Sequence, residues 1–184
     1  MNTFSDNPDY FQYETLLKEL HRFIAAGLGD SDEAEAVRED MDAPEQRLTQ
    51  DEIMRLNGLS ADLYMLQDDE VYEKHGETRE ELRASLKSAL DRHDHEAILS
   101  LLRKGTPFLT TGQVAALRGR CYAALGHLET ALLFMHYALR HEPEEAMHGM
   151  FIVGLLLQLN RTGDALAETQ EYARIGEKTL VLAV

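Results

Sequence analysis

Apolar residues recur every three or four positions along most of this chain, which is the period of an amphipathic α-helix. The pattern is clearest from residue 114 to residue 143, in the stretch VAALRGRCYAALGHLETALLFMHYALRHEP. One apolar face runs up to Gly126, a residue type that favours a helix end because it tolerates left-handed backbone. A second apolar face follows, and Pro143 prevents the helix from simply continuing. The stretch therefore predicts two helices joined by a tight turn.

Small and aromatic residues within this stretch occur at the spacing of a known repeat. The residues concerned are Gly119, Tyr122, Gly126, Ala131, Ala138 and Pro143. In this skeleton the stretch resembles the tetratricopeptide repeat, although Met135 and Ala115 stand where that family usually has aromatic residues. Gly119 and Ala131 are small enough to let the two antiparallel helices approach closely.

The family's repeat length of about 34 residues gives a second test of the resemblance. Adding it carries Gly126 to Asn160, and asparagine is the next-best residue at a left-handed helix end. Subtracting it carries Gly126 to Arg92, so the first unit is degenerate and its phase can slip by one residue. We expect about three units over residues 78–175, because one repeat cannot bury its apolar face alone.

Further helices are predicted on both sides of the repeats. Residues 1–76 carry three of them, opened by helix caps at Asn7, Ser31 and Thr49. The first helix should bury a stripe made of Tyr13, Leu16, Leu17, Leu20, Phe23 and Ile24. Residues 68–76 form a predicted linker or a frayed extension of the third helix, and the last helix should close at Gly176.

These elements predict an all-α fold in three parts. Residues 1–76 are an acidic N-terminal extension of three helices. Residues 77–176 are a short α-solenoid of tetratricopeptide-like helical hairpins, and residues 177–184 are an apolar C-terminal tail.

The 184-residue chain has a formal net charge of −15, and the charge is unevenly distributed. Residues 1–76 contain 19 acidic and 6 basic side chains, whereas residues 77–184 contain 14 and 12. The acidic first part would repel nucleic acid and anionic membranes, so we expect neither as a partner. One cysteine excludes an intrachain disulfide, and the sequence shows neither a signal-peptide pattern nor an apolar run of about 18 residues. These features favour a cytoplasmic protein.

Candidate chemistry is sparse. Cys121 lies on the apolar face of a predicted helix, where a buried and unreactive thiol is the ordinary outcome. His93-Asp94-His95 suggests a metal site, but residues two apart diverge by about 200° on a helix, so Asp94 is better explained as a helix cap. The sequence contains no phosphate-binding glycine loop, nucleophile elbow or HExxH motif. We therefore predict no enzyme, no catalytic residue, no cofactor and no bound metal.

Recognition of another protein is the function that remains. In tetratricopeptide folds the first helix of each hairpin lines a concave groove, and the matching positions here give a candidate partner-binding surface. It comprises Arg79, Arg83, Gln113, Ala116, Arg120, Met147, Met150 and Leu157. Methionines adapt to varied apolar partners, and arginines can pair with carboxylates. The resemblance thus implies a non-enzymatic adaptor that binds a peptide or a helix of a protein partner in the groove.

Three alternatives stay open at this point. The groove can instead be filled by the protein's own N-terminal helix or C-terminal tail. Small acidic three-repeat proteins with a helical extension also resemble dimeric chaperones of secretion clients, and a homodimer would form here through the N-terminal helix or the tail. A metal-dependent or enzymatic site would have to use the histidines and the acidic residues 68–70.

Overall fold

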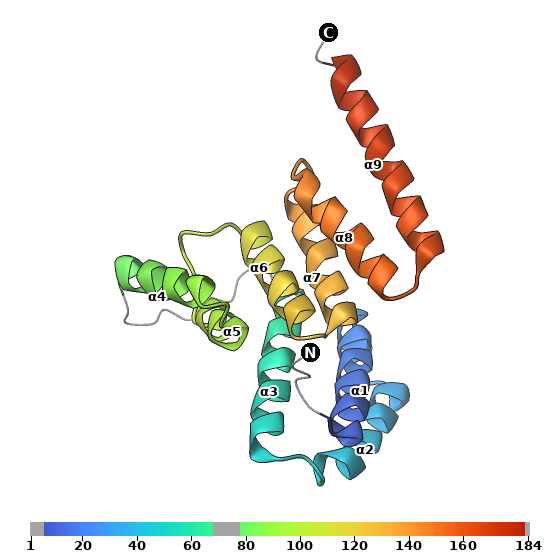
Figure 1. Ribbon diagram of the computed structural model, residues 1–184. Helices are drawn as coiled ribbons and strands as arrows, with labels where there is room; N and C mark the ends of the chain where they lie inside the picture. Colours follow the sequence, from blue (N-terminus) through green and yellow to red (C-terminus); the bar gives the residue numbers. More distant parts are fainter. Residues whose placement is uncertain (1–5, 68–77, 183–184) are drawn as a thin grey trace. The chain divides into compact units, whose positions relative to one another are not determined.

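The computed structural model describes residues 6–67 and 78–182, with side chains up to residue 172. Within these ranges the chain is helical and contains no strand, which confirms the all-α prediction (Figure 1). The chain divides into two compact units, Met1–Tyr72 and Glu73–Val184. The predicted linker at residues 68–76 lies outside the described residues.

The first unit contains α1 (Pro8–Ala25), α2 (Asp32–Glu45) and α3 (Gln50–Tyr64). Each helix begins at the predicted cap: the side chains of Asn7, Ser31 and Thr49 accept hydrogen bonds from backbone N–H groups of the following first turn. Helix α1 packs against both α2 and α3. The buried apolar residues of this unit are Tyr10, Leu17, Ala34, Val37, Met41, Leu56, Leu59 and Leu63.

The buried side of α1 differs from the predicted stripe. Of that stripe only Leu17 is fully buried, and it is joined by Tyr10, Glu14 and His21. The other members of the stripe are only half-buried, while polar side chains of α1 enter the centre between α2 and α3. They are tolerated there because they are hydrogen-bonded, Glu14 to the Lys18 ammonium at 3.0 Å and His21 to Ser60 at 3.1 Å.

The second unit is a succession of helices in which each packs against the next (Figure 1). The helices are α4 (Arg79–Asp91), α5 (His95–Arg103), α6 (Thr111–Ala124), α7 (Leu128–His141), α8 (Ala146–Gln158) and α9 (Thr162–Leu182). Thr78 and Thr110 form capping boxes with Glu81 and Gln113, and Asp94 caps α5 as predicted. The order of contacts is that of consecutive helical hairpins.

A left-handed residue lies in the turn between α4 and α5, between α6 and α7 and between α8 and α9, and a further one, Gly105, lies between α5 and α6. Gly126 has φ of 90° and Asn160 has φ of 58°, as predicted. The first hairpin turns at His93, with φ of 53°, rather than at Arg92. The three turns are thus separated by 33 and 34 residues, and the degenerate first unit is out of phase by one position.

The central hairpin, α6 and α7, is packed as closely as its small residues predict. A Cβ atom built at Gly119 would lie 2.7 Å from the Met135 Sδ atom and 3.2 Å from the Ala131 carbonyl oxygen. A larger residue at position 119 would therefore push the two helices apart. Cys121 is buried within this hairpin, as expected for a structural thiol.

The last helix is longer than the sequence suggested. Helix α9 continues through Gly176 to Leu182, so the predicted end at Gly176 is wrong. A glycine inside a helix costs only about 1 kcal/mol relative to alanine, and no proline follows it, while Glu177, Lys178, Leu180 and Leu182 favour a helix. Residues 177–182 therefore extend α9 instead of forming a separate tail. The predicted docking of the tail concerns side chains outside the described residues.

Candidate functional site

Helix α8 exposes a row of apolar side chains on one face. Met147, Met150 and Leu157 are 53%, 67% and 53% exposed. Their spacing of three and seven residues places them on one side of the helix. The opposite side, which includes Ile152 and Leu155, is buried against the neighbouring helices. The sequence showed α8 as apolar nearly all round, and the structure separates this pattern into a core face and a solvent face.

Gly154 lies in the middle of the exposed row, between Met150 and Leu157. A Cβ atom built at Gly154 would meet no atom within 4 Å. The row therefore has a notch, with a large apolar side chain about one turn away on either side.

Helix α6 contributes a cation next to this row. The guanidinium carbon of Arg120 lies 6.0 Å from the centroid of the Phe151 ring on α8. An exposed contact of this kind contributes about 0.5–1 kcal/mol and holds the arginine beside α8. Gln113 is also exposed, whereas the predicted groove residue Ala116 is buried and offers a partner almost no surface.

Glu142, in the turn between α7 and α8, ties the start of α6 to the start of α8. Its carboxylate accepts hydrogen bonds from the Thr110 hydroxyl and from His148 Nε2, the latter at 3.1 Å. These two hydrogen bonds, that of Thr110 first, hold the pKa of Glu142 below its usual value. Gly112 leaves room for the glutamate, since a Cβ there would lie 2.5 Å from the Glu142 Cγ atom.

These contacts show that α6 and α8 run in the same direction. Their first turns meet around Glu142, and further along both helices Arg120 reaches Phe151. The same turn contains an open recess of about 520 Å³, lined by Gln113, His141, Glu142, Pro143, Glu144 and Glu145. The surface shared by α6 and α8 thus has glutamates at its start and a cation further along.

The two arginines predicted on the first hairpin lie elsewhere on the unit. Arg79 and Arg83 are exposed on α4, and the Arg83 guanidinium carbon lies 5.1 Å from the centroid of the Phe108 ring, in the loop before α6. The described contacts therefore join Arg83 to that loop, while they join Arg120 to α8. The predicted surface is brought together on α6 and α8, and the contacts do not extend it to α4.

Sequence reasoning missed a buried arginine in the central hairpin. Arg118 is 1% exposed and is the largest of the fully buried side chains. It lies four residues after Val114 and three before Cys121, so it shares the predicted apolar face of α6. A charged residue on an apolar face was the signal that could have identified it.

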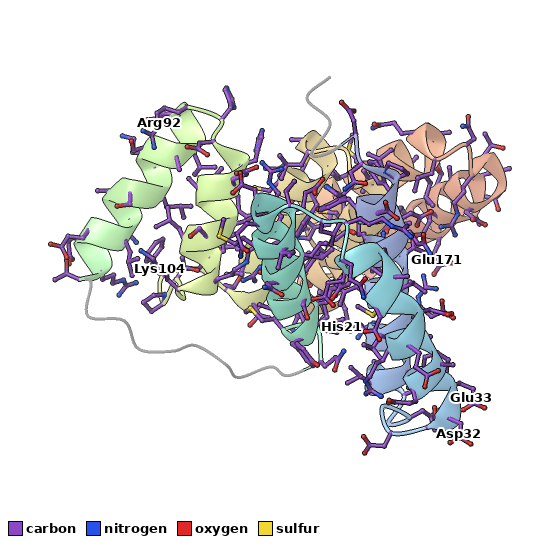
Figure 2. The ribbon with its side chains drawn as sticks, turned by 90° about the horizontal axis from the view of Figure 1, so that it is seen from below. His21, Asp32, Glu33, Arg92, Lys104 and Glu171 are labelled. Carbon is purple, nitrogen blue, oxygen red and sulfur yellow. The ribbon has the colours of Figure 1, made fainter. Side chains whose placement is uncertain are left out.

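A buried histidine in the first unit was also missed. His21 of α1 lies among side chains of the first unit (Figure 2), with Nε2 3.1 Å from the Ser60 hydroxyl and Nδ1 3.4 Å from the Gln67 amide nitrogen. If Gln67 donates to Nδ1, the proton sits on Nε2 and is donated to Ser60. His21 then cannot act as the base that would activate Ser60. Burial lowers the pKa of His21, which favours the neutral ring.

A cluster of metal-ligating side chains and a membrane-spanning helix are both absent from the described part of the chain. No group of three or more histidine, cysteine or acidic side chains there could hold a metal ion. Asp94 caps α5 by accepting a hydrogen bond from the Ala97 N–H at 3.1 Å, which confirms the cap interpretation of His93-Asp94-His95. The acidic residues 68–70 lie outside the described residues. Among the described helices none has the length and apolar character needed to cross a membrane.

Comparison of the chain with protein-family models, with curated proteins and with solved structures gave no match. The resemblance to the tetratricopeptide repeat therefore stays a prediction that rests on the residues of this chain.

Proposed function

We propose that this protein is a non-enzymatic interaction module that binds a peptide or a helix of another protein. The binding surface is the α6–α8 face, which we define by its exposed members and its notch. It consists of Gln113, Arg120, Met147, Met150, Gly154 and Leu157. The observation that supports the proposal is the row of exposed methionine and leucine side chains on α8 beside the Arg120 guanidinium.

Two features support a tetratricopeptide-like class for the second unit. The left-handed turns at Gly126 and Asn160 are 34 residues apart, which is the repeat length of that family. Helices α6 and α8, the first helices of two successive hairpins, run in the same direction with α7 packed against both. In such an arrangement the first helices share one surface, and here this is the α6–α8 face.

The experiment is an affinity purification from the cells in which the protein is made. The test variant combines Arg120→Glu with Met150→Glu, and the control for the apolar-to-glutamate change is Leu166→Glu, on a similarly exposed apolar residue of α9. We expect the double variant to lose partners that the wild type and the control retain. All three proteins should first show the same helical circular-dichroism signal and similar melting temperatures. Retention of every partner by the folded double variant would exclude the α6–α8 face.

A further inference from the structure

We infer that the partner of the α6–α8 face is an amphipathic α-helix that crosses α8 at Gly154 and pairs a carboxylate with Arg120. This inference rests on the proposed function and specifies the chemistry of the partner. It draws on three observations. The Cβ position of Gly154 is open, the backbone groups of α8 are already engaged in helical hydrogen bonds, and charge is distributed unequally over the face.

Gly154 differs from the glycines of α6 and from Gly149, the other glycine of α8. A Cβ at Gly112, Gly119 or Gly149 would lie 2.5–2.7 Å from Glu142, Met135 or Tyr172. Each of these glycines marks a place where another segment of the chain contacts the helix. Gly154 has the same cost to helix stability, about 1 kcal/mol relative to alanine, but among the described residues no atom lies within 4 Å of its Cβ position. The space above Gly154 is therefore available to another molecule.

The shape of this space fits a helix that crosses α8. The closest approach of two helix axes depends on the side chains at the crossing, and a glycine at that point permits the shortest distance. Met150 and Leu157 stand on either side of the notch and would contact the flanks of the crossing helix. Both side chains are more than half exposed in the protein alone, so burying them would contribute favourably to binding.

Hydrogen bonding of the partner's backbone favours a helical partner over an extended peptide. The backbone groups of α8 are engaged in its own helical hydrogen bonds, and Gln158, at the last turn, is the only exposed polar side chain of this helix. An extended peptide on this row would have to place its own N–H and C=O groups against methionine and leucine without hydrogen-bond partners. A helix satisfies those groups internally and presents only side chains.

The charges on the face specify where the partner carries an acidic residue. Arg120 is exposed and makes no ion pair within the described part of the chain. At the other end of α6, seven residues or about 10 Å away, Gln113 shares its recess with Glu144 and Glu145. A carboxylate on the partner would be attracted near Arg120 and repelled near this recess. The helix therefore lies with its acidic side chain towards Arg120.

The first test measures Gly154→Ala in two assays. The probe is a fluorescently labelled synthetic peptide with a leucine and alanine face, a high helix propensity and one glutamate near one end. We expect Gly154→Ala to raise the melting temperature of the free protein and to weaken peptide binding, measured by anisotropy, by about tenfold. The matched control is Gly163→Ala, which also has no atom within 4 Å of the added Cβ and should leave binding unchanged. Unchanged binding by Gly154→Ala would overturn the inference.

The second test exchanges the charges. A matched peptide carries lysine in place of the glutamate, and the wild type should bind the glutamate peptide more tightly. Arg120→Glu should reverse that preference, which a merely structural role of Arg120 would not do. Equal binding of both peptides by the wild type would refute the charge pairing.

Failure of the inference can be told from failure of the proposed function. If neither peptide binds, while the Arg120→Glu and Met150→Glu double variant still loses its cellular partners, the inference of a helical partner is wrong and the binding face is right. If the double variant keeps every partner, the proposed function itself is wrong.

Discussion

Replacing Gly149 with alanine should loosen α9 from α8. A Cβ at this position would lie 2.5 Å from the Tyr172 Cζ atom and 2.7 Å from each Cε atom. Ordinary van der Waals contact begins at 3.4 Å, so the ring has to move by roughly 1 Å. Tyr172 is half-buried against α8, and this burial, with the nearby Glu168 carboxylate, raises its pKa to about 12. A rigid ring that meets the new methyl group with three atoms cannot turn aside as a flexible side chain would.

Two opposing effects set the size of this change. Alanine is favoured over glycine inside a helix by about 1 kcal/mol. Overpacking a closely packed contact costs about 1–3 kcal/mol. We therefore expect Gly149→Ala to destabilise the α8–α9 hairpin by up to about 2 kcal/mol. Gly154→Ala changes the same helix in the same way but meets no atom, so it should stabilise the hairpin.

Native-state hydrogen exchange of the α9 amides at residues 162–172 measures this difference, because a terminal hairpin can open without unfolding its neighbours. Gly149→Ala should lower the protection of these amides, and Gly154→Ala should raise it. In a Tyr172→Ala background the ring is gone, and Gly149→Ala should then become stabilising. The reasoning is refuted if Gly149→Ala raises protection in the wild type, or if its effect does not change sign when Tyr172 is removed.

Two further predictions concern pH. Hydrogen bonds lower the pKa of Glu142 from 4.5, so its contribution to stability is present above this value and is lost as the pH falls through the lower, folded value. Urea denaturation should show Glu142→Gln as less stable than the wild type at pH 7, with a difference that shrinks on acidification; a constant difference would argue against this role. Burial lowers the pKa of His21 from 6.5, so the unfolded first unit binds the proton more tightly and stability should fall as the pH drops below 6.5. A His21→Gln variant followed by circular dichroism should lose that part of the pH dependence, and an unchanged profile would contradict the assignment.

Local chemistry made the helix starts predictable. The caps at Asn7, Ser31, Thr49, Thr78, Asp94 and Thr110 involve side chains and backbone groups within three residues, so the sequence alone identifies them. The end of α9 was not predictable in this way, because Gly176 is a local signal that the helix-forming residues after it override. The positions of α2 and α3 determine which side of α1 is buried, and the apolar stripe of α1 alone does not predict those positions.

The candidate site was predictable only where it lies on a single helix. The period of α8 placed Met147, Met150 and Leu157 together, and the structure shows all three exposed. The burial of Ala116 depends on contacts with other segments, so the sequence could not distinguish it from its exposed neighbour Arg120. Glu142 had no visible role in the sequence, because Thr110, one of its two partners, lies 32 residues away.

The near-constant interval between the left-handed residues His93, Gly126 and Asn160 restricts how this protein can change in length. One residue more or fewer inside a helix would rotate everything after it by about 100° about the helix axis. The α8 row would then turn away from Arg120. Duplication of a complete hairpin preserves every existing contact apart from those at the new junction. If the second unit is the repeat array proposed above, growth by whole hairpins is therefore the route by which such a chain can lengthen its surface.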